Sequence, residues 1–509
     1  MSSKQLKTFI DFSGGLSEIA PDNMRDNELI DAQNAVPDER GGLSKSRGTV
    51  RYNETEFDSE PIEILIEFGR DDGIVELLAF SGTTIRTWED YVLKDNLPAM
   101  PTDWDIYNNK LYWVDGTNFW VYDGHTVEEV EQEDPPPEEE ENPAWDFVKE
   151  ATFIEQRGQR HFFAKDDSNR MYFSEVGNPN HVKTENFIDA ITHDSDVITG
   201  LKEFAGSLLV FKRGAVFKWS GWSPIEDVRF DLVPVHKGAI SNRTICRVEN
   251  MLFYMAEDGV YALTNPNPDQ ISSTTNLAER KIENIIKDAK NKQHAHAIYH
   301  RGSYRLSISN DEQKTNNIEY RFFPNLTQSG SWFGGFTHPT RCYLETFDGR
   351  LFSGHPETGL IFEHGKTHNY DGDPIPLRII TRPIDIVEGM VRDSKTRRFY
   401  LAARQFLEEE SSVTVRLKMD YREQKWTIDL DDSLVWGQGV WGTHKWGWVD
   451  LITKEISVGS LGKGKRLQVV IENDVLDEPV TIYGIGVMFK ARKPRADREG
   501  VEEVSYVPD

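Results

Sequence analysis

Cysteine is nearly absent from the sequence. Cys246 and Cys342 are the only two among 509 residues, and neither belongs to a CxxC pair. Structural zinc sites and disulfide frameworks need clustered cysteines, so the sequence predicts neither of them. No uninterrupted apolar run approaches the ~18 residues of a membrane-spanning helix. The first twelve residues also lack the apolar centre of a secretion signal, so we expect synthesis in the cytoplasm.

Positive charge is scarce as well. Lys and Arg number 58 against 85 Asp and Glu, which gives a formal net charge of −27 at pH 7. Proteins that hold nucleic acid tightly replace its counterions with Lys and Arg. The charge therefore argues against tight, sequence-reading contact with nucleic acid, but it does not argue against nucleic acid passing nearby without sticking.

Aromatic residues, in contrast, make up 11% of the chain, and many lie in β-rich runs that meet at turn signals such as Asp-Gly. Pairs of such runs are typical of β-hairpins. The predicted hairpins span residues 62–80, 111–122, 161–173, 208–219, 252–261, 304–323 and 351–362. Their starts are roughly 45–50 residues apart, which is the spacing of β-propeller blades.

These patterns predict an all-β fold with few helices. We expect an N-terminal arm over residues 1–60 that closes or docks on the propeller, and a six- or seven-bladed β-propeller over residues 61–375. Further strand patterns between residues 398 and 487 predict an additional C-terminal β-sandwich-like domain over residues 376–490, followed by a charged tail at residues 491–509. A β-sandwich with long loops is the alternative to the propeller.

Two segments interrupt the strand pattern. Apolar residues at helical spacing predict a helix from Asn276 to Lys290, with Asn276 as its N-cap and Glu279 completing a capping box. Residues 131–143 are rich in Glu and Pro, so we expect no packed structure there but a loop that projects from the propeller. Its acidic residues are candidates for a surface that faces and repels DNA: Glu131, Glu133, Asp134, Glu138, Glu139, Glu140 and Glu141.

The N-terminal stretch carries an ordered set of short motifs. Glycine pairs there predict tight turns, and Asp22 or Asp26 is a candidate cap for a short helical turn that runs through Glu28 to Ala32. The motif residues are Phe12, Gly14, Gly15, Leu16, Pro21, Asp26, Asn27, Glu28, Asp31, Asn34, Gly42, Arg47 and Gly48. In this order and spacing they resemble the opening of the tail nozzle, or packaged-DNA-stabilisation, proteins of short-tailed bacteriophages. The resemblance extends less sharply to about residue 365.

This resemblance implies a non-enzymatic structural protein of the virion tail without a cofactor. It implies a homo-oligomeric ring, most often a hexamer, below the portal or its adaptor and beside tail fibres or other tail proteins. The lumen of the ring would continue the DNA channel, hold packaged double-stranded DNA and conduct it during ejection, without sequence-specific binding. The assignment of residues 131–143 as a loop lining that lumen is our own hypothesis and rests on charge alone.

Other functions find weaker support in the residues. His294, His296 and His300 lie close in sequence, but a strand would place His300 too far from His296 for both to bind one metal ion. No phosphate-binding loop and no nucleophile elbow occur. A tail-tip protein that binds receptor glycans is one alternative, with the Trp-rich segment 436–448 as a candidate surface, although burial or an assembly interface fits that segment better. A propeller enzyme that degrades polysaccharide is a second, because paired carboxylates could serve it.

Overall fold

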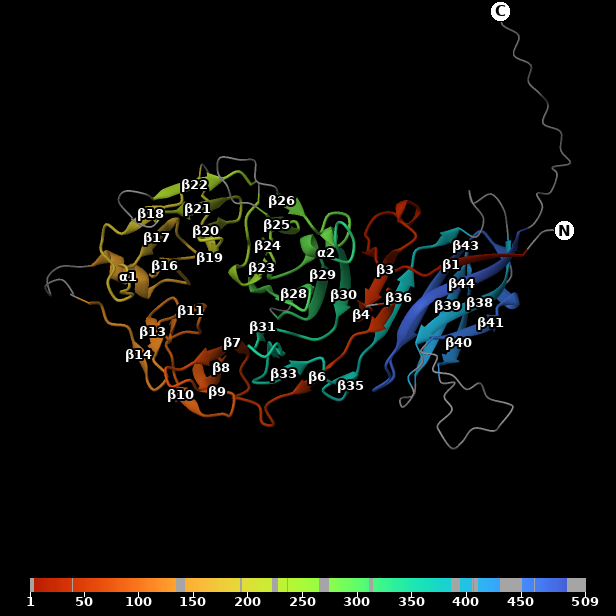
Figure 1. The fold of residues 1–509 in the computed structure, drawn as a ribbon, viewed down its shortest axis with the longest axis horizontal. Helices are drawn as coiled ribbons and strands as arrows, with labels where there is room; N and C mark the ends of the chain where they lie inside the picture. The colour runs from red at the N-terminus through yellow and green to blue at the C-terminus, as the bar shows by residue number, and fades with distance from the viewer. Residues whose placement is uncertain are drawn as a thin grey trace, which may run out of the picture.

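Radial antiparallel sheets make up most of the molecule, and a second lobe of two sheets lies beside them (Figure 1). The computed structural model describes residues 4–38, 40–133, 142–192, 195–221, 228–235, 237–264, 274–310, 315–385, 394–404, 406, 411–430, 451–461 and 463–491. Among these residues, no helix is long and apolar enough to cross a membrane. Strands make up nearly all of the regular structure in the described chain, which is therefore all-β, as the sequence predicts.

Five blades are independent four-stranded sheets, each numbered here by its place along the chain. Blade 1 holds β7 (Ile62–Gly69), β8 (Val75–Ser81), β9 (Thr84–Thr87) and β10 (Val92–Lys94). Blade 2 holds β11 (Asp103–Tyr107), β12 (Lys110–Val114), β13 (Phe119–Tyr122) and β14 (Val127–Glu129). Blade 3 holds β15 (Phe153–Arg157), β16 (Arg160–Ala164), β17 (Arg170–Phe173) and β18 (Phe187–Asp189). Blade 4 holds β19 (Ile198–Phe204), β20 (Ser207–Lys212), β21 (Val216–Ser220) and β22 (Arg229–Val233). Blade 5 holds β23 (Cys246–Val248), β24 (Met251–Met255), β25 (Val260–Leu263) and β26 (Thr274–Asn276). In each blade the first strand lies nearest the axis.

Two further blades complete the ring. The sixth holds β27 (His296–His300), β28 (Ser303–Ile308), β29 (Ile318–Phe323) and β30 (Ser331–Phe336). The seventh holds β31 (Cys342–Glu345), β32 (Leu351–Gly354) and β33 (Ile361–His364), and its outer strand is β6 (Thr49–Arg51), which comes from the N-terminal segment. The propeller is therefore closed by strands from distant parts of the chain, β33 and β6, with β34 (Asn369–Tyr370) and β35 (Asp373–Pro374) beside them.

The second lobe consists of two sheets that face each other. One sheet holds β1 (Lys4–Phe9), β4 (Ala35–Pro37), β5 (Leu43–Lys45), β38 (Ser394–Arg404), β41 (Leu451–Ser457), β42 (Lys463–Gly464) and β44 (Thr481–Ala491). The other holds β2 (Gly15–Leu16), β3 (Glu28–Gln33), β36 (Leu377–Thr381), β37 (Ile384–Asp385), β39 (Ser412–Met419), β40 (Arg422–Asp429) and β43 (Arg466–Asn473). This second sheet is continuous with blade 6, because β3 pairs with both β30 and β36.

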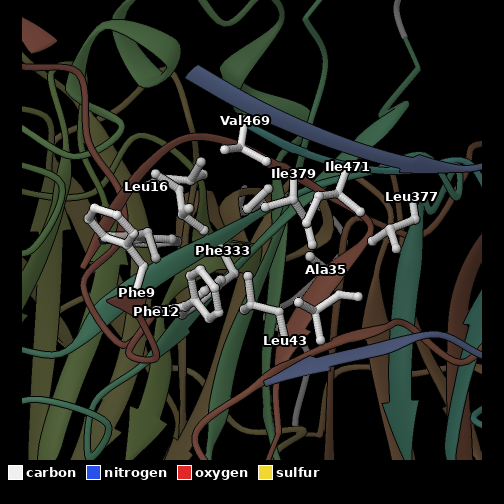
Figure 2. Close-up of a cluster of buried hydrophobic side chains, with 14 of the residues drawn as sticks. Phe9, Phe12, Leu16, Ala35, Leu43, Phe333, Leu377, Ile379, Val469 and Ile471 are labelled. Carbon is white, nitrogen blue, oxygen red and sulfur yellow. The ribbon is translucent and has the colours of Figure 1, made fainter. Parts of the chain in front are cut away.

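A single hydrophobic core fills the sandwich and the junction with the propeller. Figure 2 shows part of it: Phe12 and Leu16 of the N-terminal segment lie among Phe333 of blade 6 and Val469 of β43. Strands β39 and β43 alternate buried apolar and more exposed residues, as a sheet with one face in a core requires. The N-terminal segment thus packs between the two lobes.

All seven predicted hairpins are confirmed, from β7–β8 to β32–β33. The long helix is wrong: α2 spans only Glu283–Asp288, because Arg280 takes a left-handed φ of 60° that interrupts a helix, and Asn276 ends β26 instead. The expected helical turn through Ala32 is also wrong. Three residues of 3-10 helix, η1 (Pro21–Asn23), precede β3, whose residues pair with the sandwich sheet. The remaining short elements are α1 (Pro143–Lys149), η2 (Asn242–Thr244), η3 (Lys292–His294) and η4 (Gly459–Leu461).

The axial channel as candidate functional site

The inner strands of the blades line a channel along the propeller axis. Two cavities of about 800 and 730 Å³ open on it, and both are bounded by Glu63, Thr102, Asn242 and Arg243. These four residues therefore form a constriction between two mouths. The larger cavity is lined by acidic residues from β11, β15 and β19, and its polar character makes it the candidate site.

The constriction is built by η2, the loop that enters blade 5. Asn242 Nδ2 donates to Asp103 Oδ2 on β11 at 2.9 Å, and Arg243 Nη1 donates to the backbone oxygen of Glu63 on β7 at 3.1 Å. Arg341 Nε donates to the Glu63 carboxylate at 2.8 Å from the opposite side. Blades 1, 2, 5 and 7 are thus tied together across the axis by side chains.

A second set of bonds joins blades 2, 3 and 4 in the larger cavity. The backbone N–H of Ile154 donates to Asp103 at 3.1 Å, and Lys202 Nζ donates to Glu155 at 3.0 Å. The Glu155 carboxylate also accepts the backbone N–H of Glu203 at 2.8 Å. Charged groups therefore act here as connectors between neighbouring blades.

Electrostatics in the cavity are unusual. Loss of hydration, with the nearby Glu155 carboxylate adding to it, raises the pKa of both Asp103 and Asp105 to about 7. Lys202 also loses hydration, but the attraction of Glu155, Asp103 and Asp105 outweighs this loss and raises its pKa. Both aspartates keep partial access to solvent, so protons can exchange with it near neutral pH.

The sequence did not single out these channel residues. Asp103 and Asp105 are two positions apart on β11, so they lie on the same face of the strand. This spacing was the one sequence signal that could have placed both carboxylates together. The predicted hairpins began at the second strand in most blades, because the inner strands carry polar residues toward the channel and lack an apolar run.

The N-terminal motif residues lie away from the channel, at the junction of the two lobes. Gly15 has φ of 63°, and a Cβ there would lie 2.3 Å from the carbonyl oxygen of Trp332. A Cβ on Gly48 would lie 1.7 Å from the carbonyl oxygen of Asn369, and one on Gly42 would lie 2.6 Å from that of Ile482. Gly14 is equally confined, by Asn27. These glycines are required by close backbone approaches.

The polar motif residues make the matching contacts. Glu28 pairs with Lys281 at 2.7 Å, Asp31 with Arg378 at 3.4 Å, and Asp26 with Arg382. Asn34 has φ of 52° and donates to the carbonyl oxygen of Pro376 at 3.0 Å. Asn27 donates to Ser13 Oγ at 3.2 Å, while Phe12 and Leu16 are buried. Pro21 begins η1, and Pro21 and Arg47 are exposed.

The acidic candidates lie elsewhere again. Glu131 and Glu133 follow β14, the outermost strand of blade 2, so they lie at the outer rim of the propeller rather than in its channel. The backbone N–H of Glu133 donates to the oxygen of Asn180 at 3.0 Å. Asp134 and Glu138, Glu139, Glu140 and Glu141 lie outside the described residues, as does the Trp-rich segment 436–448.

The histidines form no metal centre. His294 belongs to η3, whereas His296 and His300 lie on β27, so the three do not share one strand. Over the described ranges, no group of three or more His, Cys, Asp or Glu side chains could hold a metal ion.

No protein-family model matches the sequence, and no curated protein matches it. Among solved structures, the chain is similar to the WD40 domain of Pan2 from Neurospora crassa, at 8% identity and a TM-score of 0.38, over 64% of this chain and 96% of that one. It is similar to the WD40 propeller of Doa1, at 8% identity and a TM-score of 0.38, over 64% and 97%. The match to an exo-β-1,3-galactanase from Phanerochaete chrysosporium has 10% identity and a TM-score of 0.23, over 66% and 95%. The propeller fold rests on the sheet topology above, and these likenesses carry no inference about activity.

Proposed function

We propose that this chain is a structural subunit of a bacteriophage tail, a nozzle or head-tail connector protein. Copies of it would form a ring, of six subunits by the family resemblance, below the portal or adaptor in the virion. The ring would retain packaged DNA and conduct it during ejection, with no enzymatic step. Tail fibres or other tail proteins would attach beside it.

The placement of the N-terminal motif carries this proposal. Most of the residues that resemble the nozzle proteins fix the N-terminal segment against propeller and sandwich, by close glycine contacts and ion pairs, whereas Pro21 and Arg47 are exposed. The motif therefore corresponds to one structural feature of this two-lobed fold, the attachment of the N-terminal segment, which supports treating its short pieces as a single pattern. The net charge of −27 supports passage of DNA without tight binding.

The route of the DNA follows from the constriction. Side chains of Asn242, Arg243 and Glu63 bridge the axis of a single propeller, so a duplex cannot follow that axis. In the proposed assembly, DNA therefore passes through the opening between copies. Of the acidic candidates, the described Glu131 and Glu133 follow the outermost strand of blade 2 and so lie at the rim of the propeller.

Electron cryo-microscopy of intact particles tests the proposal. We expect a ring of this chain on the tail axis, with an opening slightly wider than duplex DNA. Density for single copies or trimers at fibre tips, with no axial ring, would instead support the glycan-binding alternative.

A substitution provides a second test. Arg47 belongs to the motif and is exposed in the single chain, so it is available to a partner. We expect Arg47→Glu to reduce incorporation into particles. Arg229→Glu, which changes an exposed arginine on the outer strand of blade 4, is the matched control and should assemble normally.

The enzyme alternative has one specific observation in its favour, the raised pKa of Asp103 and Asp105 in the larger of the two axial cavities. Against it, Asp103 and Glu155 already hold blades together. An assay of reducing ends released from capsular polysaccharide distinguishes the two. Release by the wild-type protein that is lost in Asp105→Asn would establish the enzyme, and no release is expected.

A further inference from the structure

Hydrophobic clusters fill six of the contacts between neighbouring blades. They lie between blades 1 and 2, 2 and 3, 3 and 4, 4 and 5, 5 and 6, and 7 and 1. Within the described chain, no such cluster lies between blades 6 and 7. This seam instead combines charged and polar groups with two buried rings, Phe336, which stacks on Arg321, and Phe362, which contacts His338. That sets it apart, because continuous apolar burial is the usual way in which blades pack.

Strand alternation shows what fills the seam. On β28, Tyr304 and Leu306 belong to the core toward blade 5, so Arg305 and Ser307 point the other way. Ser307 Oγ donates to the carbonyl oxygen of Thr340, in the connection between blades 6 and 7, at 3.0 Å. Blade 7 contributes Tyr343, which hydrogen-bonds Glu319 of β29 at 2.5 Å.

Two arginines lie directly opposite each other in this seam. Arg305 of β28 is the register partner of Arg321 of β29, so neighbouring strands present two guanidinium groups to one face. Glu319 accepts a hydrogen bond from Arg321 Nε and is buried, and it lies close to both arginines. Two further carboxylates near the seam already have cationic or histidine partners among the described residues: Glu345 pairs with His300 at 3.0 Å, and Asp371 pairs with Arg51 at 2.6 Å. Positive charge is therefore in excess.

Arg305 is the group that this arrangement leaves incomplete. Its Nε is buried and has no hydrogen-bond partner among the described residues. A buried donor without a partner destabilises the fold, and more so when it is charged. Arg305 as a whole residue keeps partial access to solvent, which is the route by which a small ion would reach it.

The surroundings suit an anion. The ring of His338 lies 5.2 Å from that of His364, and His364 Nε2 is 2.8 Å from Ser353 Oγ. Loss of hydration and the facing Arg321 lower the pKa of Arg305 to about 10. Loss of hydration, and after it repulsion by His338 and the two arginines, lowers the pKa of His364. A negative ion would offset each of these repulsions.

We propose that the seam between blades 6 and 7 binds a small oxyanion, with inorganic phosphate as its simplest form, between Arg305 and Arg321. A guanidinium fork matches the planar pair of oxygens that an oxyanion presents. The ion neutralises the excess charge and closes the polar seam. This site is independent of the proposed tail function.

Phosphate binding to the full chain tests the site. We expect isothermal titration at pH 7.5 and constant ionic strength to show one saturable phosphate site per chain. Thermal unfolding should show a midpoint that rises with phosphate and then levels off. Arg305→Gln should weaken phosphate binding at least tenfold.

Controls separate specific binding from general salt effects. Arg350→Gln removes an arginine of blade 7 that pairs with Asp348 at the surface, and it should bind phosphate as the wild type does. Phosphate also stabilises proteins by exclusion from their surface, without saturation. A rise in midpoint that is linear and equal in wild type and Arg305→Gln would overturn the proposal.

Two further outcomes are decisive. If Arg305→Gln does not fold, the titration of the wild type stands by itself, and the lack of a saturable signal there refutes the site. A short DNA duplex tests whether the phosphate of a nucleic acid backbone can serve. We expect no competition from the duplex, because the seam is too buried to admit it, and competition would overturn the assignment to a free ion.

Discussion

Asn242 donates a hydrogen bond to Asp103 across the propeller axis at 2.9 Å, although 139 positions separate the two residues in the chain. The bond joins the entry of blade 5 to the inner strand of blade 2. It depends on Gly200, where a Cβ would lie 2.5 Å from Asn242 Oδ1. One glycine therefore makes room for the loop that narrows the channel.

Gly200→Ala should displace η2 from the channel. The added Cβ would meet Asn242 Oδ1 at 2.5 Å and Ile245 Cδ1 at 2.9 Å, so the loop must shift. We expect faster amide hydrogen exchange over residues 242–245, measured by mass spectrometry. Gly69→Ala, at the end of β7 with open space around it and no left-handed φ, is the control. Equal exchange in both variants would mean that Gly200 does not position the loop.

Asp103→Asn should change how stability depends on pH. The folded pKa of Asp103 is raised to about 7, above its unfolded value, so its stabilising contribution is complete below pH 4 and is lost as pH rises through 7. An asparagine keeps one oxygen to accept from Asn242 and Ile154, gives up the second, which accepts the Trp104 N–H, and removes this loss. The measured quantity is the melting temperature of the variant minus that of the wild type. We expect this difference to be about 1–2 °C higher at pH 8 than at pH 5.

Asp123→Asn is the contrasting control for this pH effect. Backbone N–H groups, first that of Thr126, lower the pKa of Asp123, so its contribution is present above the unfolded pKa and is lost in acid. This variant should lose stability at pH 8. If both substitutions shift the melting temperature in the same direction at pH 8, burial is not the source of the Asp103 effect.

His161→Phe should remove an acid sensitivity. Burial lowers the pKa of His161 to about 3, and the ring packs against Tyr107 and Tyr112. The unfolded histidine takes up a proton near pH 6.5, so stability falls as pH drops below that value. At pH 5 this linkage costs the wild type about 2 kcal/mol. Denaturant unfolding at pH 5 and 7.5 should show a smaller difference in the variant, and an unchanged difference would contradict the assignment.

Gly15→Ala should be more damaging than Gly41→Ala. Both glycines have left-handed φ, at 63° and 86°, so both substitutions carry the same backbone penalty of about 1–2 kcal/mol. Only the Cβ at position 15 meets a neighbour, the Trp332 carbonyl oxygen at 2.3 Å. We expect Gly15→Ala to lower the free energy of unfolding by at least about 3 kcal/mol. Similar losses in both variants would show that the junction can relax.

The hairpins were predictable because turn residues and apolar runs are local signals. Asp72-Gly73 and Asp258-Gly259, for example, lie between strands that form as expected. Apart from β7, which has an apolar run of its own, the inner strands were not predictable by the same reasoning. Asp103 and Glu155 face a polar channel, so their strands lack the apolar pattern that marks a buried sheet.

Long-range features escaped the sequence for a different reason. The period of Ile282, Ile285 and Ile286 indicated a long helix, but the left-handed Arg280 interrupts it, and no local pattern shows this. Likewise, the predicted hairpin over residues 304–323 did not show that Arg305 and Arg321 are direct partners, because this depends on the register of β28 and β29. Register determines such encounters, and a single sequence does not specify register.

The ring closure between β6 and β33 also constrains how the protein is made. Thr49 of β6 is synthesised long before His364, its pairing partner on β33. The interval is longer still between Lys4 of β1 and its partner Lys490 on β44. At about 5–20 residues per second, the N-terminal strands stay unpaired for roughly 15 s or more while the blades between them emerge. During synthesis these exposed edges can pair with the wrong strand, so a chaperone that covers them, or faster translation of the intervening blades, would raise the yield of correctly closed propellers.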